Sequence, residues 1–68
     1  MKNKVKYYRF LANELTQQDL AEKVGVTRQT IIAIEKGSFN PSIKLALKLS
    51  NVLNAKLEDL FYLEDQDY

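Results

Sequence analysis

The residue types that most often carry enzyme chemistry are missing from this sequence of 68 residues. It contains no histidine and no cysteine, which excludes the usual proton shuttle at neutral pH, the thiol nucleophile and the thiolate ligands of structural zinc. No glycine-rich phosphate loop is present, and paired carboxylates occur only near the C-terminus, where a solvated acidic end is the simpler interpretation. We therefore expect no enzyme activity, no cofactor and no metal site.

One short segment offers the chemistry of DNA recognition instead. Arg28 can form a bidentate contact with guanine, and Gln29 can form one with adenine. Ile32 and Ala33 are suited to contact with a thymine methyl group, and Lys36 with a phosphate. These residues share one face of a helix when the opposite face is buried. The alternative is that the same residues form an ordinary solvated helix surface.

Three isoleucines determine how much of that face is exposed. Ile31 and Ile34 are three residues apart and are expected to face the core. Ile31, Ile32 and Ile34 cannot all point into one core, because successive residues of a helix are rotated by about 100°. Ile32 therefore either packs beside the next helix or is exposed on a binding face.

Capping residues predict where the flanking helices begin and end. Thr16 is a good N-cap, and Asp19 completes a capping box with it, so a helix is expected over 17–24. Gly25 stands where a left-handed residue ends that helix, and Thr27 caps the next one. Two helices joined by a tight glycine-containing turn form a helix-turn-helix, in which the second helix enters the major groove.

The remaining segments predict more short helices and no strand, because no alternating run of β-branched residues is bounded by turns. The expected fold class is all-α, a compact five-helix domain over 1–68, with helices at about 4–13, 17–24, 28–36, 43–54 and 57–61 and an acidic tail at 64–68. The expected inner face of the first helix carries Val5, Tyr8 and Ala12. The expected inner face of the fourth carries Ile43, Ala46, Leu47, Ser50 and Leu53.

Charge is divided unevenly along the chain. All ten basic side chains and four acidic ones lie within 1–56, whereas 57–68 has five acidic side chains and no basic one. A basic body suits a polyanionic partner, although both parts can also be solvated surface. No signal-length or membrane-spanning apolar stretch is present, so a cytoplasmic protein is expected.

The stretch LTQQDLAEKVGVTRQTI at 15–31, continued by IEKG at 34–37 and NPS at 40–42, resembles the phage-repressor and Cro helix-turn-helix family, also called the XRE family. It is most similar to compact bacterial regulators of the cytolysin-repressor type, over roughly residues 4–63. The resemblance implies a lambda-repressor-like fold and a sequence-specific DNA-binding transcriptional regulator, with repression as the expected activity. The alternative is an antitoxin or adaptor module that binds a protein partner through the same fold.

The resemblance also implies roles for single residues. Base contacts are expected from Arg28, Gln29 and Ala33, with Ile32 alongside. Contacts with the DNA backbone are expected from Gln17, Thr27, Thr30, Lys36 and Asn40, and a partly buried ion pair from Arg9 and Glu35. The sequence departs from the family at Asn13-Glu14, where a glycine is usual, and at Tyr7 and Phe10, where charge is more common. Those two aromatic residues are either exposed, alone or as part of a contact surface, or packed locally.

One recognition helix contacts few base pairs, so a homodimer on an inverted-repeat operator is expected, with half-sites about 34 Å apart. The expected dimer interface is the apolar run Phe61, Tyr62 and Leu63, which a chain of this length can hardly bury alone. Leu57 and Leu60 are expected mainly to seal the core.

Overall fold

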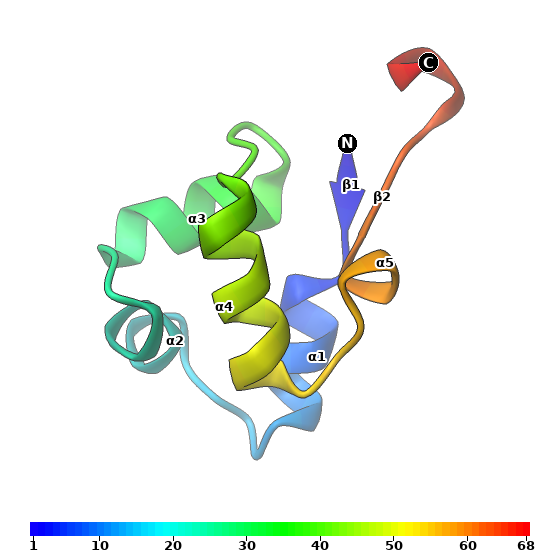
Figure 1. Cartoon of the computed structure of the whole chain (residues 1–68). Helices are drawn as coiled ribbons and strands as arrows, with labels where there is room; N and C mark the ends of the chain where they lie inside the picture. Colours follow the sequence, from blue (N-terminus) through cyan, green and yellow to red (C-terminus); the bar gives the residue numbers. More distant parts are fainter.

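The structure is a computed structural model that describes all residues, 1–68. Five α-helices form the body of the molecule, and two very short strands lie side by side at one edge of it (Figure 1). In chain order the elements are β1 (Lys2–Asn3), α1 (Val5–Leu11), α2 (Gln17–Val24), α3 (Arg28–Lys36), α4 (Ile43–Leu53), α5 (Leu57–Leu60), β2 (Phe61–Tyr62) and the 3-10 turn η1 (Asp65–Asp67). The expected five-helix fold is confirmed. None of the helices has both the length and the apolar character needed to cross a membrane.

The predicted caps of α2 and α3 are present. The Asp19 backbone N–H donates to Thr16 Oγ1 at 3.0 Å, and the Thr16 backbone N–H donates to Asp19 Oδ2 at 3.4 Å. Gly25 ends α2 in the left-handed region, with φ of 76°. Thr27 caps α3, and Gly37 ends it with φ of 80°. These local signals fix the lengths of both helices.

The core lies between the helices, and every helix contributes to it. Val5 of α1 is fully buried, while Tyr8 and Ala12 pack against the edge of the core, as expected for that helix. Leu57 is half-buried and Leu60 is fully buried. The buried cluster consists of Val5, Leu20, Ala21, Val24, Ile31, Ile34, Leu49, Leu53 and Leu60.

The inner face of α4 differs from the expectation. Ala46 and Leu53 are buried as predicted, but Ile43 is 69% exposed and Leu47 is 51% exposed, whereas Leu49 is fully buried. The prediction was wrong because apolar residues cover most of the circumference of α4, so the helical period fits more than one stripe. The stripe that packs inward is centred on Leu49.

The expectation that the chain has no strand was also wrong. β1 and β2 pair antiparallel, with Lys2 opposite Tyr62 and Asn3 opposite Phe61. Strands of two residues show no alternating pattern that could reveal them. Because the chain turns into β2 after Leu60, Phe61 lies in a strand and not in the last turn of α5.

The first helix is shorter than predicted. It ends at Leu11, and Asn13 and Glu14 adopt left-handed φ angles of 63° and 55°. Glycine adopts such angles at little cost. Asparagine also tolerates them, but a glutamate in this region is strained.

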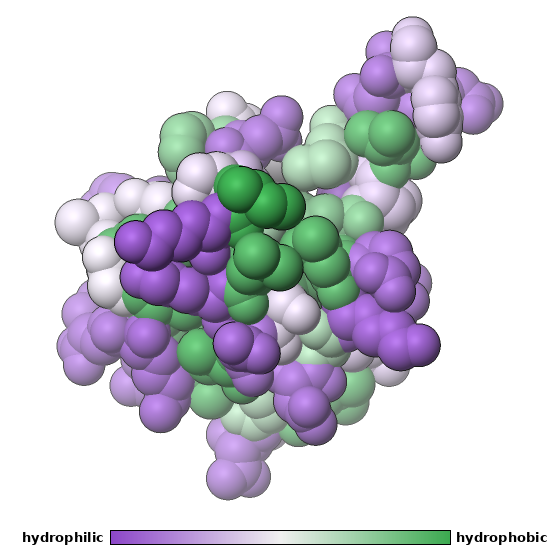
Figure 2. Space-filling view, in the orientation of Figure 1, coloured by the Kyte–Doolittle hydropathy of each residue, from purple (hydrophilic) through white to green (hydrophobic).

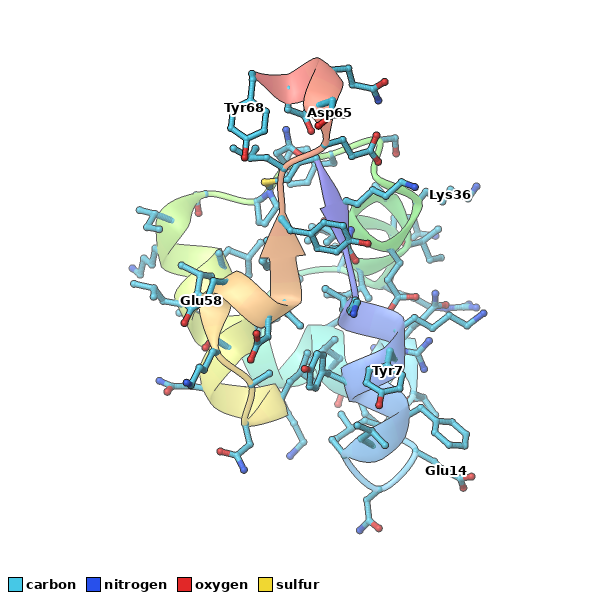
Figure 3. The ribbon with its side chains drawn as sticks, turned by 90° about the vertical axis from the view of Figure 1, so that its right-hand side faces the viewer. Tyr7, Glu14, Lys36, Glu58, Asp65 and Tyr68 are labelled. Carbon is cyan, nitrogen blue, oxygen red and sulfur yellow. The ribbon has the colours of Figure 1, made fainter.

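The acidic tail folds back onto the N-terminal strand. Lys2 Nζ lies 3.4 Å from Glu64 Oε1, and the α-amino group of Met1 lies 3.2 Å from Asp67 Oδ2. The hydrogen bond from the Glu64 backbone N–H, followed by the one from the α-amino group, lowers the pKa of Asp67 below its ordinary value. Figure 3 shows the tail, labelled at Asp65 and Tyr68, above the two strands.

Candidate nucleic-acid interface

The turn between α2 and α3 is fixed by short-range hydrogen bonds. The Val26 backbone N–H donates to the carbonyl of Ala21 at 2.9 Å, which continues the hydrogen bonding of α2 into the turn. Thr27 Oγ1 accepts from the Thr30 backbone N–H at 3.3 Å, and the two hydroxyl oxygens lie 3.1 Å apart. Thr27 and Thr30, both predicted to lie near the DNA backbone, therefore also set the start of α3.

Helix α3 presents its N-terminal end to solvent and buries its middle. Ile31 and Ile34 are fully buried, as predicted. Arg28 and Gln29 are exposed, whereas Ile32 and Ala33 are half-buried. Ile32 is therefore neither fully packed beside the next helix nor fully exposed, the two alternatives that the sequence left open. The residues at the start of α3 remain free to contact another molecule.

A polar cleft opens between α1 and the first turns of α2 and α3. Its volume is about 670 Å³, and no hydrophobic residue lines it. The lining includes Gln17 and Arg28, two of the predicted DNA contacts, together with Arg9 of the predicted ion pair. The lining residues are Lys6, Arg9, Glu14, Thr16, Gln17, Gln18 and Arg28.

The Arg9–Glu35 ion pair that the family resemblance implies is present in the structure. Arg9 Nε donates to Glu35 Oε2 at 2.9 Å, and Arg9 Nη2 donates to Oε1 at 3.3 Å. The side chains of Arg9 and Glu35 are 16% and 9% exposed. Arg9 Nη1 also donates to the Leu15 carbonyl at 2.8 Å. One guanidinium group thus ties α1 both to α3 and to the segment that leads into α2.

The same carboxylate holds Gln17. Gln17 Nε2 donates to Glu35 Oε1 at 3.1 Å, so the amide at the first position of α2 is anchored to α3. Helices α1 and α2, which both line the cleft, are therefore connected to each other through Glu35 of α3.

The predicted backbone contacts fall into two groups along α3. Thr27 and Thr30 lie at its N-terminal end, whereas Lys36 and Asn40 are exposed at and beyond its C-terminal end. The amide of Gln17 is bound to Glu35, near the C-terminal end of α3. Lys36 lines a second polar pocket of about 370 Å³ together with β1 and Glu64 of the tail. Figure 3 shows Lys36 in the upper part of the molecule, below the tail, and Glu14 near the bottom.

Sequence reasoning assigned no site role to four residues of the cleft, Lys6, Glu14, Thr16 and Gln18. Lys6 precedes Arg9 by three residues, which places both on one side of α1, and this spacing could have indicated it. Gln18 follows Gln17 in the first turn of α2 and donates to Glu22 Oε2 at 2.8 Å. It carries no pattern of its own that would reveal a position in the cleft.

The fold and the exposed α3 define a helix-turn-helix protein, and comparison with known proteins agrees. The helix-turn-helix family model matches residues 5–60. The chain belongs to this family of DNA-binding transcriptional regulators.

The similar proteins carry corresponding names. An uncharacterized HTH-type transcriptional regulator of Methanocaldococcus jannaschii is 61% identical over 67 residues, covering 98% of this chain and 100% of the relative. A second one, from Bacillus subtilis, is 51% identical over 67 residues, with coverage of 98% and 100%. The crystal structure of the restriction-modification controller protein C.AhdI from Aeromonas hydrophila is similar with a TM-score of 0.73 and 32% identity, covering 84% of this chain and 85% of that one.

Proposed function

We propose that this protein is a cytoplasmic repressor that binds a specific operator with α3 in the major groove. This proposal is supported by the way α3 is buried. Ile31 and Ile34 anchor the helix in the core, while the residues at its start are exposed to solvent. N-terminal residues of a recognition helix are the ones that reach base edges. The base contacts we assign are Arg28, Gln29, Ile32 and Ala33.

The two groups of backbone contacts are spaced to suit this placement. Helix α3 has nine residues, so at about 1.5 Å per residue it is roughly 13 Å long. The major groove is about 12 Å wide. With α3 in the groove, Thr27 and Thr30 reach the backbone on one side, while Lys36 and Asn40 reach it on the other. Gln17, held by Glu35 at 3.1 Å, is a further backbone contact.

We further propose that the repressor is a homodimer on an inverted repeat, because one recognition helix reads too few base pairs for a useful specificity. The surface that suits a second copy is an apolar groove of about 430 Å³ beside the exposed side chains of α4. Figure 2 shows an apolar strip over α4 with hydrophilic surface on both sides. Phe61 lines the groove, and next to it Tyr62 and Leu63 are 38% and 50% exposed. The groove is lined by Met1, Pro41, Ile43, Ala46, Leu57, Glu58 and Phe61.

The charges beside this strip suit two copies in contact. Because residues of α4 turn by about 100° each, Lys44 and Lys48 lie on one flank of the strip formed by Ile43 and Leu47. Glu58 lines the groove on the other flank. A two-fold axis running along the strip brings the basic flank of one copy against the acidic flank of the other.

Selection of binding sites from random duplex DNA tests the operator. We expect the wild type to enrich an inverted repeat and Arg28→Ala to lose or relax it, since an Arg–guanine contact contributes about 1–3 kcal/mol of discrimination. Lys56→Ala, which removes an exposed cation between α4 and α5, is the matched control and should select the same site. If the wild type enriches no sequence, the proposal is wrong, and a protein partner becomes the target of the search.

Sedimentation equilibrium tests the dimer with three leucines of similar exposure. Leu47, Leu63 and Leu11 are 51%, 50% and 59% exposed, and only the first two lie at the proposed interface. Leu47→Ser and Leu63→Ser should weaken the dimer by about tenfold each, as expected for loss of a buried leucine contact. Leu11→Ser on α1 should leave it unchanged. A wild type that remains monomeric at tens of micromolar would refute the dimer.

A further inference from the structure

The carboxylate of Glu35 has two roles in the structure. It is the acidic partner of the Arg9 ion pair, and it also accepts a hydrogen bond from Gln17, which lines the polar cleft. It accepts three hydrogen bonds, two from Arg9 at 2.9 and 3.3 Å and one from Gln17 at 3.1 Å. The Glu35 side chain is 9% exposed, so it does not itself reach out to a ligand. Gln17, by contrast, is half-buried and lines the cleft.

We propose that Glu35 is a positioning residue for DNA binding, which holds the Gln17 amide at the cleft and cancels the charge of Arg9. Arg9, although it lines the same cleft, is then not a phosphate contact. The cation of the cleft that meets phosphate is Lys6, while Arg28 remains a base contact. This inference rests on the proposed function of α2 and α3. It adds a distinction between the side chains that contact DNA and Glu35, which acts by positioning one of them.

The case for Arg9 follows from its partners. Its Nε, Nη1 and Nη2 groups all donate to acceptors within the protein, and its side chain is 16% exposed. A cation already neutralised by a carboxylate at 2.9 Å releases few counterions when it approaches DNA. Lys6 and Arg28 line the cleft without an ion-pair partner.

The case for Gln17 follows from its hydrogen bond. A glutamine amide has two N–H donors, and the bond to Glu35 uses one of them. The second donor remains for a phosphate oxygen. Because the side chain is already held, binding DNA removes less of its rotational freedom than it would from an unrestrained glutamine.

Two double variants separate this positioning from the ion pair. Removing Glu35 alone would leave the Arg9 cation buried without its partner and could unfold the protein. Arg9→Met combined with Glu35→Gln removes both charges and keeps an amide oxygen that can accept from Gln17. Arg9→Met combined with Glu35→Met removes both charges and also the acceptor. Circular dichroism and thermal melting establish that both variants fold.

Binding to a mixed-sequence duplex is then measured by fluorescence anisotropy over a range of salt concentrations. We expect the variant with Gln at position 35 to keep the wild-type salt dependence, because Arg9 makes no phosphate contact. We expect the variant with Met at position 35 to bind about three- to tenfold more weakly, as for one lost backbone hydrogen bond. In the Gln17→Ala background the two double variants should bind equally. The side-chain amide signals of Gln17 in a 1H–15N spectrum should move only in the variant that lacks the acceptor.

Equal affinity of the two double variants would overturn the positioning role of Glu35. The variant that combines Arg9→Met with Glu35→Gln tests Arg9. If its salt dependence is lower than that of the wild type by about one counterion, Arg9 does contact phosphate and its assignment here is wrong. Both results require a wild type that binds DNA. A wild type that binds no duplex at low salt would instead overturn the proposed function itself.

Discussion

Glu35→Ala tests whether the Arg9–Glu35 pair is a buried structural contact. The substitution removes three hydrogen bonds and leaves the guanidinium of Arg9 with only the Leu15 carbonyl as a partner. Breaking one side of a buried pair costs about 3–5 kcal/mol, whereas an exposed pair contributes about 0–1 kcal/mol. Because the Arg9 side chain is 16% exposed and can be partly hydrated, we expect a loss near the lower end, about 3 kcal/mol.

That loss is large compared with the stability of so small a domain. At about 0.05–0.15 kcal/mol per residue, a chain of this length is stable by roughly 3–10 kcal/mol. Each kcal/mol lowers the melting temperature of a domain of this size by about 4–8 °C. Glu35→Ala should therefore lower it by about 12–24 °C, and a wild type at the low end of the stability range would unfold outright.

Urea denaturation followed by circular dichroism measures the effect directly, with an unchanged m-value expected if the native and unfolded states keep their compactness. Glu22→Ala is the matched control, because Glu22 is an exposed acid of α2 whose hydrogen-bond partner is Gln18. Arg9→Met combined with Glu35→Leu should recover much of the loss, since an apolar pair leaves no unpaired buried charge. A change below about 1 kcal/mol for Glu35→Ala, similar to that of the control, would show that water solvates the pair and that the argument from burial is wrong.

Four other predictions concern stability and DNA binding. Leu49→Ala should cost about 2–5 kcal/mol in urea denaturation, because Leu49 is fully buried at the centre of the inner face of α4; a smaller loss would place the core elsewhere. Gly25→Ala should cost about 1–2 kcal/mol through φ of 76° alone, because an added Cβ meets nothing within 4 Å. Glu14→Gly should act in the opposite direction and raise the melting temperature, since φ at Glu14 is 55°; an unchanged or lower value would mean that the angle carries no strain. The affinity of the wild type for duplex DNA should fall steeply as salt is raised, and Lys6→Ala should reduce that slope by about one counterion in an anisotropy titration.

The parts of the fold that could be predicted are those that depend on neighbouring residues in the sequence. Thr16 with Asp19, and Thr27 with Thr30, form the bonds that begin α2 and α3, and each bond spans three residues. Gly25 adopts the left-handed angle that ends α2. Such signals need no knowledge of the tertiary structure, so the two helices, the turn between them and the exposed start of α3 could be deduced in advance.

The parts that could not be predicted depend on residues far apart in the chain. The pairing of Asn3 with Phe61 joins the two ends of the domain and produces strands too short to show a period. The polar cleft combines Lys6 of α1 with Arg28 of α3, and no local pattern connects them. The link between Gln17 and Glu35 spans eighteen residues. Each joins elements that are far apart in the sequence, so it becomes visible only when the packing of those elements is known.

The error in the inner face of α4 has a physical cause that bears on function. Sequence reasoning assigned Ile43 and Leu47 to the core on the assumption that an apolar stripe faces the interior of its own chain. In the structure Leu49 and its neighbours fill that place, and Ile43 and Leu47 form a second apolar stripe that the chain leaves exposed. A polar residue at either position would cost the monomer little, because neither side chain is buried in it. We expect the exposed stripe on α4 to be covered in the proposed dimer, so that the error marks a surface for the sedimentation experiment to test.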